Sequence, residues 1–202
     1  MNNHFPLDIE PEEEPTPTDA PEVLPKQRLV STLFETMETL VLALIMVLVI
    51  NTVSARIRVD GISMEPTFYQ DNFVIVNKLA YRIGRIERGD VVVFPYPNNP
   101  DEDYIKRVIG LAGDEVEIQG GKVKVNGAIL DEPYISEPPK RDYYIDVPEG
   151  ELFLMGDNRN DSSDSRSWGT LPVEDVIGKA VFIYWPFPDF GIVTHYQLDV
   201  PE

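Results

Sequence analysis

The stretch Tyr104-Ile105-Lys106-Arg107-Val108-Ile109-Gly110 is typical of a short β-strand. Aromatic and β-branched residues fill it, acidic residues precede it and a glycine closes it. Because side chains alternate between the two faces of a strand, Lys106 shares one face with Tyr104 and Val108, and Arg107 lies on the other. Two interpretations are open: an edge strand with two snorkelling cations, or a strand whose lysine is desolvated, neutral and able to act as a base.

Short apolar runs of the same kind recur from Arg56 onward, and turn residues bound each of them. The prolines between the runs leave little room for long helices. The sequence therefore predicts a mainly β protein: a coiled antiparallel β-sheet body with a loop-rich insertion around residues 111–145. Alternation in Glu115–Ile118 and Val123–Val125, with turns at Gly120-Gly121 and Asn126-Gly127 leading into Ile129-Leu130, predicts a small meander there. The runs are Phe73–Val76, Val91–Phe94, Glu115–Ile118, Val123–Val125, Leu152–Met155 and Val181–Tyr184.

An uncharged run of seventeen residues, Thr39–Ala55, precedes this β-rich region. Its length is at the short limit for a membrane-spanning helix, and we predict one N-terminal transmembrane anchor over residues 31–55. A buried core helix and a cleaved signal peptide are the alternatives, the second because Val53-Ser54-Ala55 matches a small-residue cleavage pattern. The long acidic segment before the run is unlike the short basic start of a signal peptide. Self-cleavage after Ala55 is a separate hypothesis that rests on the same small residues.

The charge of the chain is strongly negative and unevenly distributed. The net charge is −18, and residues 1–30 hold seven acidic residues, two basic residues and six prolines. We predict that residues 1–30 form a disordered acidic tail and that residues 56–202 form the β-rich domain. A nucleic-acid partner is not expected, because neutralising phosphates needs a basic surface.

The absence of cysteine and the scarcity of histidine narrow the chemistry. Without cysteine there is no thiolate nucleophile, and with only His4 and His195 a histidine-based metal site is nearly excluded. The acidic loop 155–166 does not follow the EF-hand pattern either, since Arg159 occupies the third position of a loop that begins at Asp157. No metal and no cofactor are therefore expected, and lysine is left as the plausible base for a serine nucleophile such as Ser63.

Three separated stretches of the chain resemble the motifs of type I signal peptidases, over roughly residues 35–185. They are Ser63-Met64-Glu65-Pro66-Thr67, Tyr104–Gly110 followed by Gly113-Asp114, and Gly156-Asp157-Asn158-Arg159 continuing through Ser162, Asp164, Ser165 and Arg166. Their order and spacing fit as well. The single anchor suggests the Gram-positive, cyanobacterial or plastid kind of this family, whose members are membrane-bound serine endopeptidases with a coiled antiparallel β-sheet body.

The resemblance implies roles for individual residues. Ser63 matches the nucleophile and Lys106 the general base, and the backbone N–H of Ser63 is expected to form part of the oxyanion hole. Ser162 matches the serine that orients the lysine, and Asp164 and Arg166 match the pair that stiffens the loop behind it. Gly61 departs from the family, because some relatives carry a serine there that completes the oxyanion hole.

The resemblance also implies a substrate and a location. Family members remove signal peptides from translocated preproteins after small residues, in an Ala-X-Ala-like pattern, and bind the substrate as an extended strand. The tail is expected in the cytoplasm and the catalytic domain outside it, on a plasma membrane or a thylakoid-type membrane. The implied partners are preproteins, the lipid bilayer and, as a candidate, the secretion translocon. The expected substrate-binding residues, within the segments Ile57–Ile62 and Asp103–Ile105 and beside Ser63, are Ile57, Ile62, Met64, Asp103, Tyr104 and Ile105.

Two rival functions remain open at this point. Self-cleaving SOS repressors and mutagenesis proteins also use serine and lysine on a similar β-fold, but those proteins lack an anchor. A non-enzymatic, membrane-anchored binding module is the other rival, and the joint presence of Ser63, Lys106 and Ser162 counts against it. The aromatic segment Tyr184–Phe190 has two interpretations as well, core packing or a belt at the bilayer interface.

Overall fold

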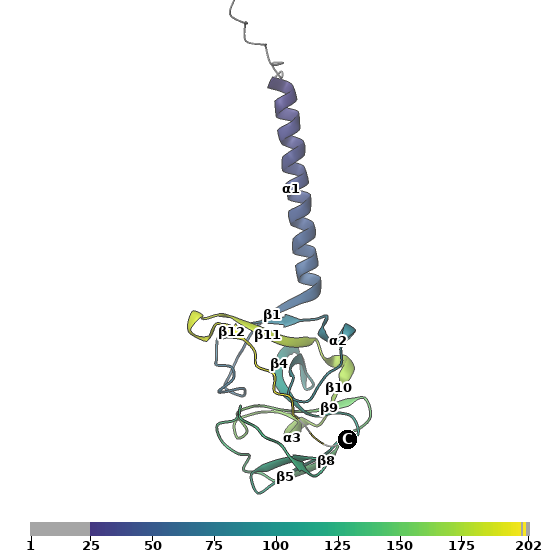
Figure 1. Cartoon of the computed structure of the whole chain (residues 1–202), viewed down its shortest axis with the longest axis vertical. Coiled ribbons are helices and arrows are strands. Elements are labelled where there is room, and N and C mark those ends of the chain that lie inside the picture. The colour runs from purple at the N-terminus through teal and green to yellow at the C-terminus, as the bar shows by residue number, and fades with distance from the viewer. Residues whose placement is uncertain (1–24, 199, 201–202) are drawn as a thin grey trace, which may run out of the picture. The chain divides into compact units, whose positions relative to one another are not determined.

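The computed structural model describes residues 25–198 and 200 (Figure 1). They belong to two compact units that divide between Met46 and Val47, the first holding most of helix α1 (Pro25–Val53) and the second the β-rich body. The strands are β1 (Ser54–Arg58), β2 (Phe73–Asn77), β3 (Val91–Tyr96), β4 (Asn99–Gly110), β5 (Glu115–Gln119), β6 (Lys122–Val125), β7 (Ala128–Ile129), β8 (Tyr143–Asp146), β9 (Glu151–Met155), β10 (Leu171–Pro172), β11 (Gly178–Trp185) and β12 (Gly191–Ile192). Short helical turns are α2 (Ala80–Ile83), α3 (Ser165–Trp168), η1 (Val173–Asp175) and η2 (Phe187–Asp189). The predicted fold class, mainly antiparallel β with one N-terminal apolar helix, is confirmed.

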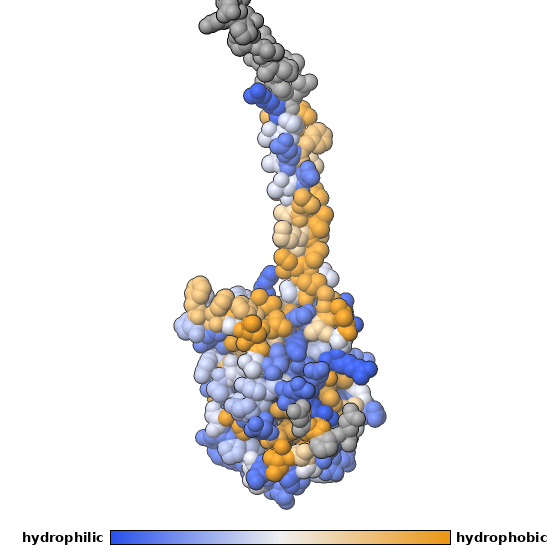
Figure 2. All heavy atoms as spheres, in the orientation of Figure 1, coloured by the Kyte–Doolittle hydropathy of each residue, from blue (hydrophilic) through white to orange (hydrophobic). Residues whose placement is uncertain are grey.

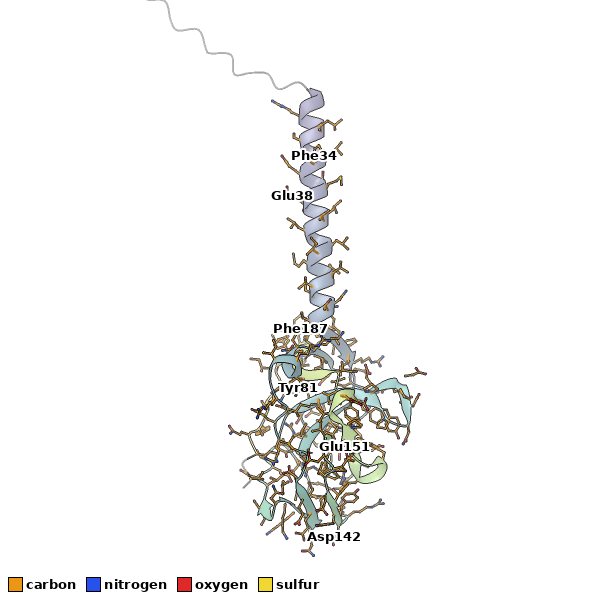
Figure 3. The ribbon with its side chains drawn as sticks, turned by 90° about the vertical axis from the view of Figure 1, so that its right-hand side faces the viewer. Phe34, Glu38, Tyr81, Asp142, Glu151 and Phe187 are labelled. Carbon is orange, nitrogen blue, oxygen red and sulfur yellow. The ribbon has the colours of Figure 1, made fainter. Side chains whose placement is uncertain are left out.

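Helix α1 is longer at its start than the predicted anchor. It covers 29 residues, and its segment Arg28–Val53 is long and apolar enough to cross a membrane. Figure 3 shows Phe34 and Glu38 projecting away from its axis. Residues 25–30, assigned to the tail from the sequence, are helical, because backbone hydrogen bonding continues beyond the apolar run and proline is accepted in a first helical turn. The remainder of the predicted tail, residues 1–24, lies outside the described residues.

The helix ends at Val53, two residues before the predicted end of the anchor. Ser54 and Ala55 belong instead to β1, where Ala55 pairs with Val76 of β2. A cut after Ala55 would therefore require this part of the β1–β2 pairing to open.

The strands of the body form two antiparallel sheets. The larger has the order β1-β2-β11-β3-β4-β9-β10, with β12 on β11, and the smaller has the order β7-β6-β5-β8. The region expected to be a loop-rich insertion thus carries a sheet of its own. The strict alternation of apolar and polar residues explains this second sheet. Its apolar side chains face one way and are buried in one cluster with Phe153 of β9; they are Val116, Ile118, Val123 and Val125.

In the larger sheet, β1 and β4 each have an edge that lacks a strand partner in the described part of the chain. β1 is the terminal strand of the sheet and pairs with β2 alone. β4 pairs with β3 through Asp103 to Arg107, whereas its pairing with β9 begins only at Arg107. The other edge of residues 103–106 is therefore open, and an open strand edge offers backbone hydrogen-bonding groups to another extended chain.

Aromatic side chains of the Tyr184–Phe190 segment lie at the surface rather than in the core. Trp185 is 49% exposed, and Phe187, Phe190 and Ile192 of β12 are more than half exposed. Figure 2 shows apolar surface gathered over the β11–β12 hairpin. Core packing is therefore the wrong interpretation for these three aromatic residues.

Arg107 occupies the centre of the body, on the face of β4 opposite Lys106. Its guanidinium donates Nε–H to Asp157 Oδ1 at 2.8 Å and Nη2–H to Asp157 Oδ2 at 2.7 Å, and both side chains are fully buried. It also donates to the Gly89 carbonyl at 2.8 Å and stacks over the ring of Tyr134, 4.1 Å from its centroid. The sequence predicted this face for Arg107 but no partner, and the partner is Asp157.

Asp157 links this cation to a second segment. Its Oδ2 accepts a hydrogen bond from Thr67 Oγ1 at 2.5 Å. One buried ion pair therefore joins β4, the loop after β9 and the turn that contains Ser63.

Replacing Asp157 with asparagine is expected to destabilise the body strongly. The substitution keeps the shape of the side chain but leaves the Arg107 charge buried and uncompensated, which costs about 3–5 kcal/mol. The measurement is urea unfolding of the full chain in non-ionic detergent, followed by tryptophan fluorescence.

The matched control for this prediction is Asp71→Asn. Asp71 forms an ion pair with Arg58 at 2.6 Å, but both side chains are 58% exposed. The expected loss of unfolding free energy is therefore within about 1 kcal/mol. Equal losses in the two variants would contradict the assigned role of the buried pair.

Candidate active site

Ser63 lies in the turn that follows β1, and the loop after β9 holds this turn in place. The backbone N–H of Asn158 donates to the Ser63 carbonyl at 3.1 Å, and its side-chain amide donates to the Ile62 carbonyl at 3.2 Å. Gly61 precedes the serine with φ of +93°, a left-handed conformation that favours glycine. These contacts fix the backbone of the turn while the Ser63 hydroxyl faces Lys106.

Lys106 is almost completely buried, with 3% of its surface exposed, and it contacts Ser63 directly. Its Nζ lies 2.8 Å from Ser63 Oγ and 2.9 Å from the carbonyl oxygen of Ile105. The Tyr104 ring covers it from the side, 5.0 Å away at the centroid. The geometry is that of a hydroxyl and an amine close enough to share a proton.

Burial lowers the pKa of Lys106 from its usual value near 10.5 to about 8. The cause is desolvation, which penalises the charged ammonium form, and the negative charges of Asp164 and Asp157 oppose it. Near neutral pH an appreciable fraction of the amine is thus unprotonated. This outcome favours the second of the two interpretations of the β4 sequence, a desolvated lysine.

The loop after β9 is internally bonded around Asp164. Asp164 is fully buried, pairs with Arg166 through two hydrogen bonds of 2.8 and 2.6 Å, and accepts a third from the Gly156 N–H at 3.0 Å. It also caps the N-terminus of α3 by accepting from the Arg166 N–H. The Asp164–Arg166 pairing expected from the sequence is therefore present.

Ser162 lies close to the Ser63 turn but does not form a hydrogen bond with Lys106. Its Oγ is buried and has no hydrogen-bond partner among the described residues. A Cβ added at Gly156 would collide with both Ser162 Oγ and the Ser63 carbonyl, so only glycine lets these two groups approach so closely. The orienting role of Ser162 toward Lys106 stays a prediction.

A cleft of about 470 Å³ opens beside Ser63 and Lys106. One wall continues from β1 and the other is the open edge of β4. Its lining residues are Ile57, Arg58, Val59, Asp60, Ser63, Glu102, Asp103, Tyr104, Ile105, Lys106 and Ser163.

The cleft contains some of the residues expected to bind substrate and not others. Ile57, Asp103, Tyr104 and Ile105 line it. Ile62 is outside the lining and about half exposed. Met64 is fully buried in the core next to β2, so its side chain is not accessible to a ligand.

Several residues that shape the site had no role predicted from the sequence, although Gly156, Asp157 and Asn158 belong to the third motif. Asp157 and Asn158 hold the Ser63 turn, Gly156 lets it approach the loop, and Asp60 and Glu102 line the cleft. Gly156, Asp157 and Asn158 could have been predicted as functional from their position in a polar loop directly after a buried strand. Within the described residues, no group of His, Cys, Asp and Glu side chains is arranged to hold a metal ion.

Comparison with known proteins places this geometry in a family. A family model described as signal peptidase, peptidase S26, matches residues 33–185. A probable signal peptidase I-2 of Synechocystis sp. is 41% identical over 171 residues, spanning 81% of this chain and 78% of the relative. A signal peptidase I of Bacillus caldolyticus is 42% identical over 148 residues, spanning 66% of this chain and 80% of the relative.

A solved structure of a signal peptidase I from Enterococcus faecalis is 33% identical, with a TM-score of 0.44, and covers 46% of this chain and 95% of its own. The family match extends over Ser63, Lys106 and the loop 156–166, together with residues 33–53 of the apolar helix. On the strength of that match and of the relatives' identity, this chain belongs to the signal peptidase family, peptidase S26.

Proposed function

We propose that this chain is a membrane-bound serine endopeptidase that removes signal peptides from preproteins, with Ser63 as nucleophile and Lys106 as general base. The observation that carries the proposal is the 2.8 Å contact between Ser63 Oγ and a buried lysine amine, at the end of a cleft with open strand edges. Membership of the family supplies the substrate class.

The substrate adds an extended strand to the cleft. Segments before the nucleophile and before the lysine, Ile57–Ile62 and Asp103–Ile105, offer backbone groups to it, which fixes the register of the chain to be cut. The open edges of β1 and β4 support this arrangement. Small residues one and three positions before the cut then fit beside Ser63 and Lys106.

The reaction proceeds by acyl transfer in two halves. Neutral Lys106 takes the proton of the Ser63 hydroxyl while Oγ attacks the carbonyl carbon of the scissile peptide bond. Collapse of the tetrahedral intermediate breaks the C–N bond, and the Lys106 ammonium gives its proton to the departing amine. Water then attacks the ester, Lys106 accepts its proton, and breakage of the ester bond frees the signal peptide and restores the Ser63 hydroxyl.

The oxyanion of the intermediate needs hydrogen-bond donors. The backbone N–H of Ser63 donates to no acceptor within the described residues, which leaves it available. Gly61 has open space beside it, with nothing within 4 Å of an added Cβ. A water molecule or a further backbone N–H serves as second donor in place of the serine that some relatives carry there.

Replacing either member of the Ser63–Lys106 pair is expected to abolish cleavage. Ser63→Ala removes the attacking oxygen and Lys106→Ala removes the proton acceptor, so each loss should exceed about 10³-fold in kcat. The measurement is cleavage of a preprotein with alanines one and three residues before the cut, with N-terminal sequencing of the product.

Two exposed residues provide matched controls, Ser136→Ala and Lys140→Ala. Both variants should cleave at the wild-type rate. Wild-type activity in Ser63→Ala or Lys106→Ala would contradict the assignment of Ser63 as nucleophile and Lys106 as general base.

The pH dependence of kcat/KM is expected to show an acidic limb near the lowered pKa of Lys106, about 8. Below that pH the amine is protonated and cannot accept the serine proton, so the rate should fall about tenfold per pH unit. Binding of uncleaved substrate to Ser63→Ala over the same range separates loss of binding from loss of the base. A limb close to the ordinary lysine pKa, near 10.5, would show that burial does not tune the amine.

The proposed location follows from helix α1 and the family. Residues 31–55 contain the apolar core of the anchor, the N-terminal tail faces the cytoplasm, and the peptidase domain, residues 56–202, lies outside it on a plasma or thylakoid-type membrane. The exposed aromatic side chains of the β11–β12 hairpin suit contact with the lipid interface. A secretion translocon is a candidate partner that would deliver preproteins to the same face.

Protease added outside sealed spheroplasts should digest the peptidase domain and leave a fragment with the tail and α1 protected. The reason is that only the segment beyond the helix is exposed on that side. Release of the chain by alkaline carbonate would contradict the membrane anchor, and protection of the peptidase domain would contradict its location outside the plasma membrane.

A further inference from the structure

The cleft beside Ser63 carries three carboxylates that the reaction does not use. Asp60 follows β1 on one wall, and Glu102 and Asp103 lie on β4 on the other. All three are exposed, and within the described residues none of them lies in an ion pair with a cation. Glu102 accepts one neutral hydrogen bond, from the Asn99 side chain at 2.8 Å.

The positive charges of the cleft do not offset these carboxylates. Arg58 lines the cleft, but its guanidinium pairs with Asp71 at 2.6 Å. Lys106 is buried at the catalytic end and must be neutral to work. An extended chain in this cleft therefore passes between two walls of the same negative sign.

The position of the carboxylates along β4 indicates which substrate residues lie beside them. Along β4, Asp103 and Glu102 precede Lys106 by three and four residues, or about 10 to 14 Å at a strand rise of ~3.4 Å per residue. A substrate strand has the same rise. For a substrate strand that runs parallel to β4, with the residue at the cut beside Lys106, the side chains at that distance are three and four residues earlier, at the fourth and fifth positions before the scissile bond.

We propose that Asp60, Glu102 and Asp103 form a charge filter, which favours a cationic residue and rejects an acidic one in the substrate four or five residues before the cut. This inference rests on the proposed function and deepens it by naming a preference within the preprotein substrates. Backbone hydrogen bonds position the substrate strand in the cleft. The carboxylates then attract a cationic substrate side chain and repel an acidic one without direct contact, since charges interact weakly through water over several ångströms.

The test is a panel of one preprotein with alanines fixed one and three residues before the cut. Lysine, glutamine or glutamate stands at positions four and five before the cut, and a matched set carries the same residues well after it. The full chain in non-ionic detergent should cleave the lysine version with a kcat/KM on the order of tenfold above the glutamate version, with glutamine between. Raising the ionic strength from about 0.05 M to about 0.5 M should shrink that ratio, because salt screens exposed charges.

A double variant, Asp60→Asn with Glu102→Gln, removes charge from both walls. Its lysine-to-glutamate ratio should fall toward one, and because the ratio is taken within one protein, a change in overall activity does not affect it. The matched control is Glu174→Gln with Asp175→Asn, which removes the same charge from exposed η1, outside the cleft. That variant should keep the wild-type ratio.

The outcomes separate the two levels of the proposal. If the wild type cleaves all versions at similar rates, or if the double variant keeps the wild-type ratio, the charge filter is overturned while the peptidase assignment stands. If the wild type cleaves no version although the chain is folded, the proposed function fails and the filter fails with it. A ratio that changes equally in the η1 control would also overturn the filter, since net charge alone would then explain it.

Discussion

The buried ion pair between Arg107 and Asp157 is the interaction on which the site depends. It brings together the strand that carries Lys106, the loop behind it and the turn that carries Ser63. Such a pair costs several kcal/mol of desolvation, so it contributes little net stability compared with apolar packing. Its contribution is geometric, because the bidentate contact and the Thr67 hydrogen bond leave the Ser63 turn with one position relative to β4.

Asp157 of this pair also affects the pKa of Lys106. Asp157 and Asp164 both lie close enough to raise the pKa of the lysine, and an ammonium stabilised by two bare carboxylates would remain charged. Each of them is instead bonded to an arginine, Arg107 and Arg166 respectively. Desolvation by burial outweighs the effect of both carboxylates, and the pKa of Lys106 falls.

Much of this site could be predicted from the sequence, and the parts that could not share a physical reason. Alternation along Tyr104–Gly110 assigned Lys106 and Arg107 to opposite faces, and the lack of cysteine and histidine left lysine as the base. The pairing of Arg107 with Asp157 could not be predicted, because it joins residues 50 positions apart and depends on how strands pack. The short strands within residues 115–130 were predicted from their alternation and turns, but the addition of β8 and the separation of this sheet from the larger one were not, because both depend on packing against the shared core.

The open edge of β4 is short, and this limits how tightly any preprotein is held. Residues 103–106 can form only a few ladder hydrogen bonds before the strand becomes enclosed between β3 and β9. Most of these bonds go to backbone groups that every polypeptide shares. We therefore expect modest ground-state affinity and rapid release of the cleaved peptide, which are the properties of a peptidase that turns over many unrelated sequences rather than one cognate partner.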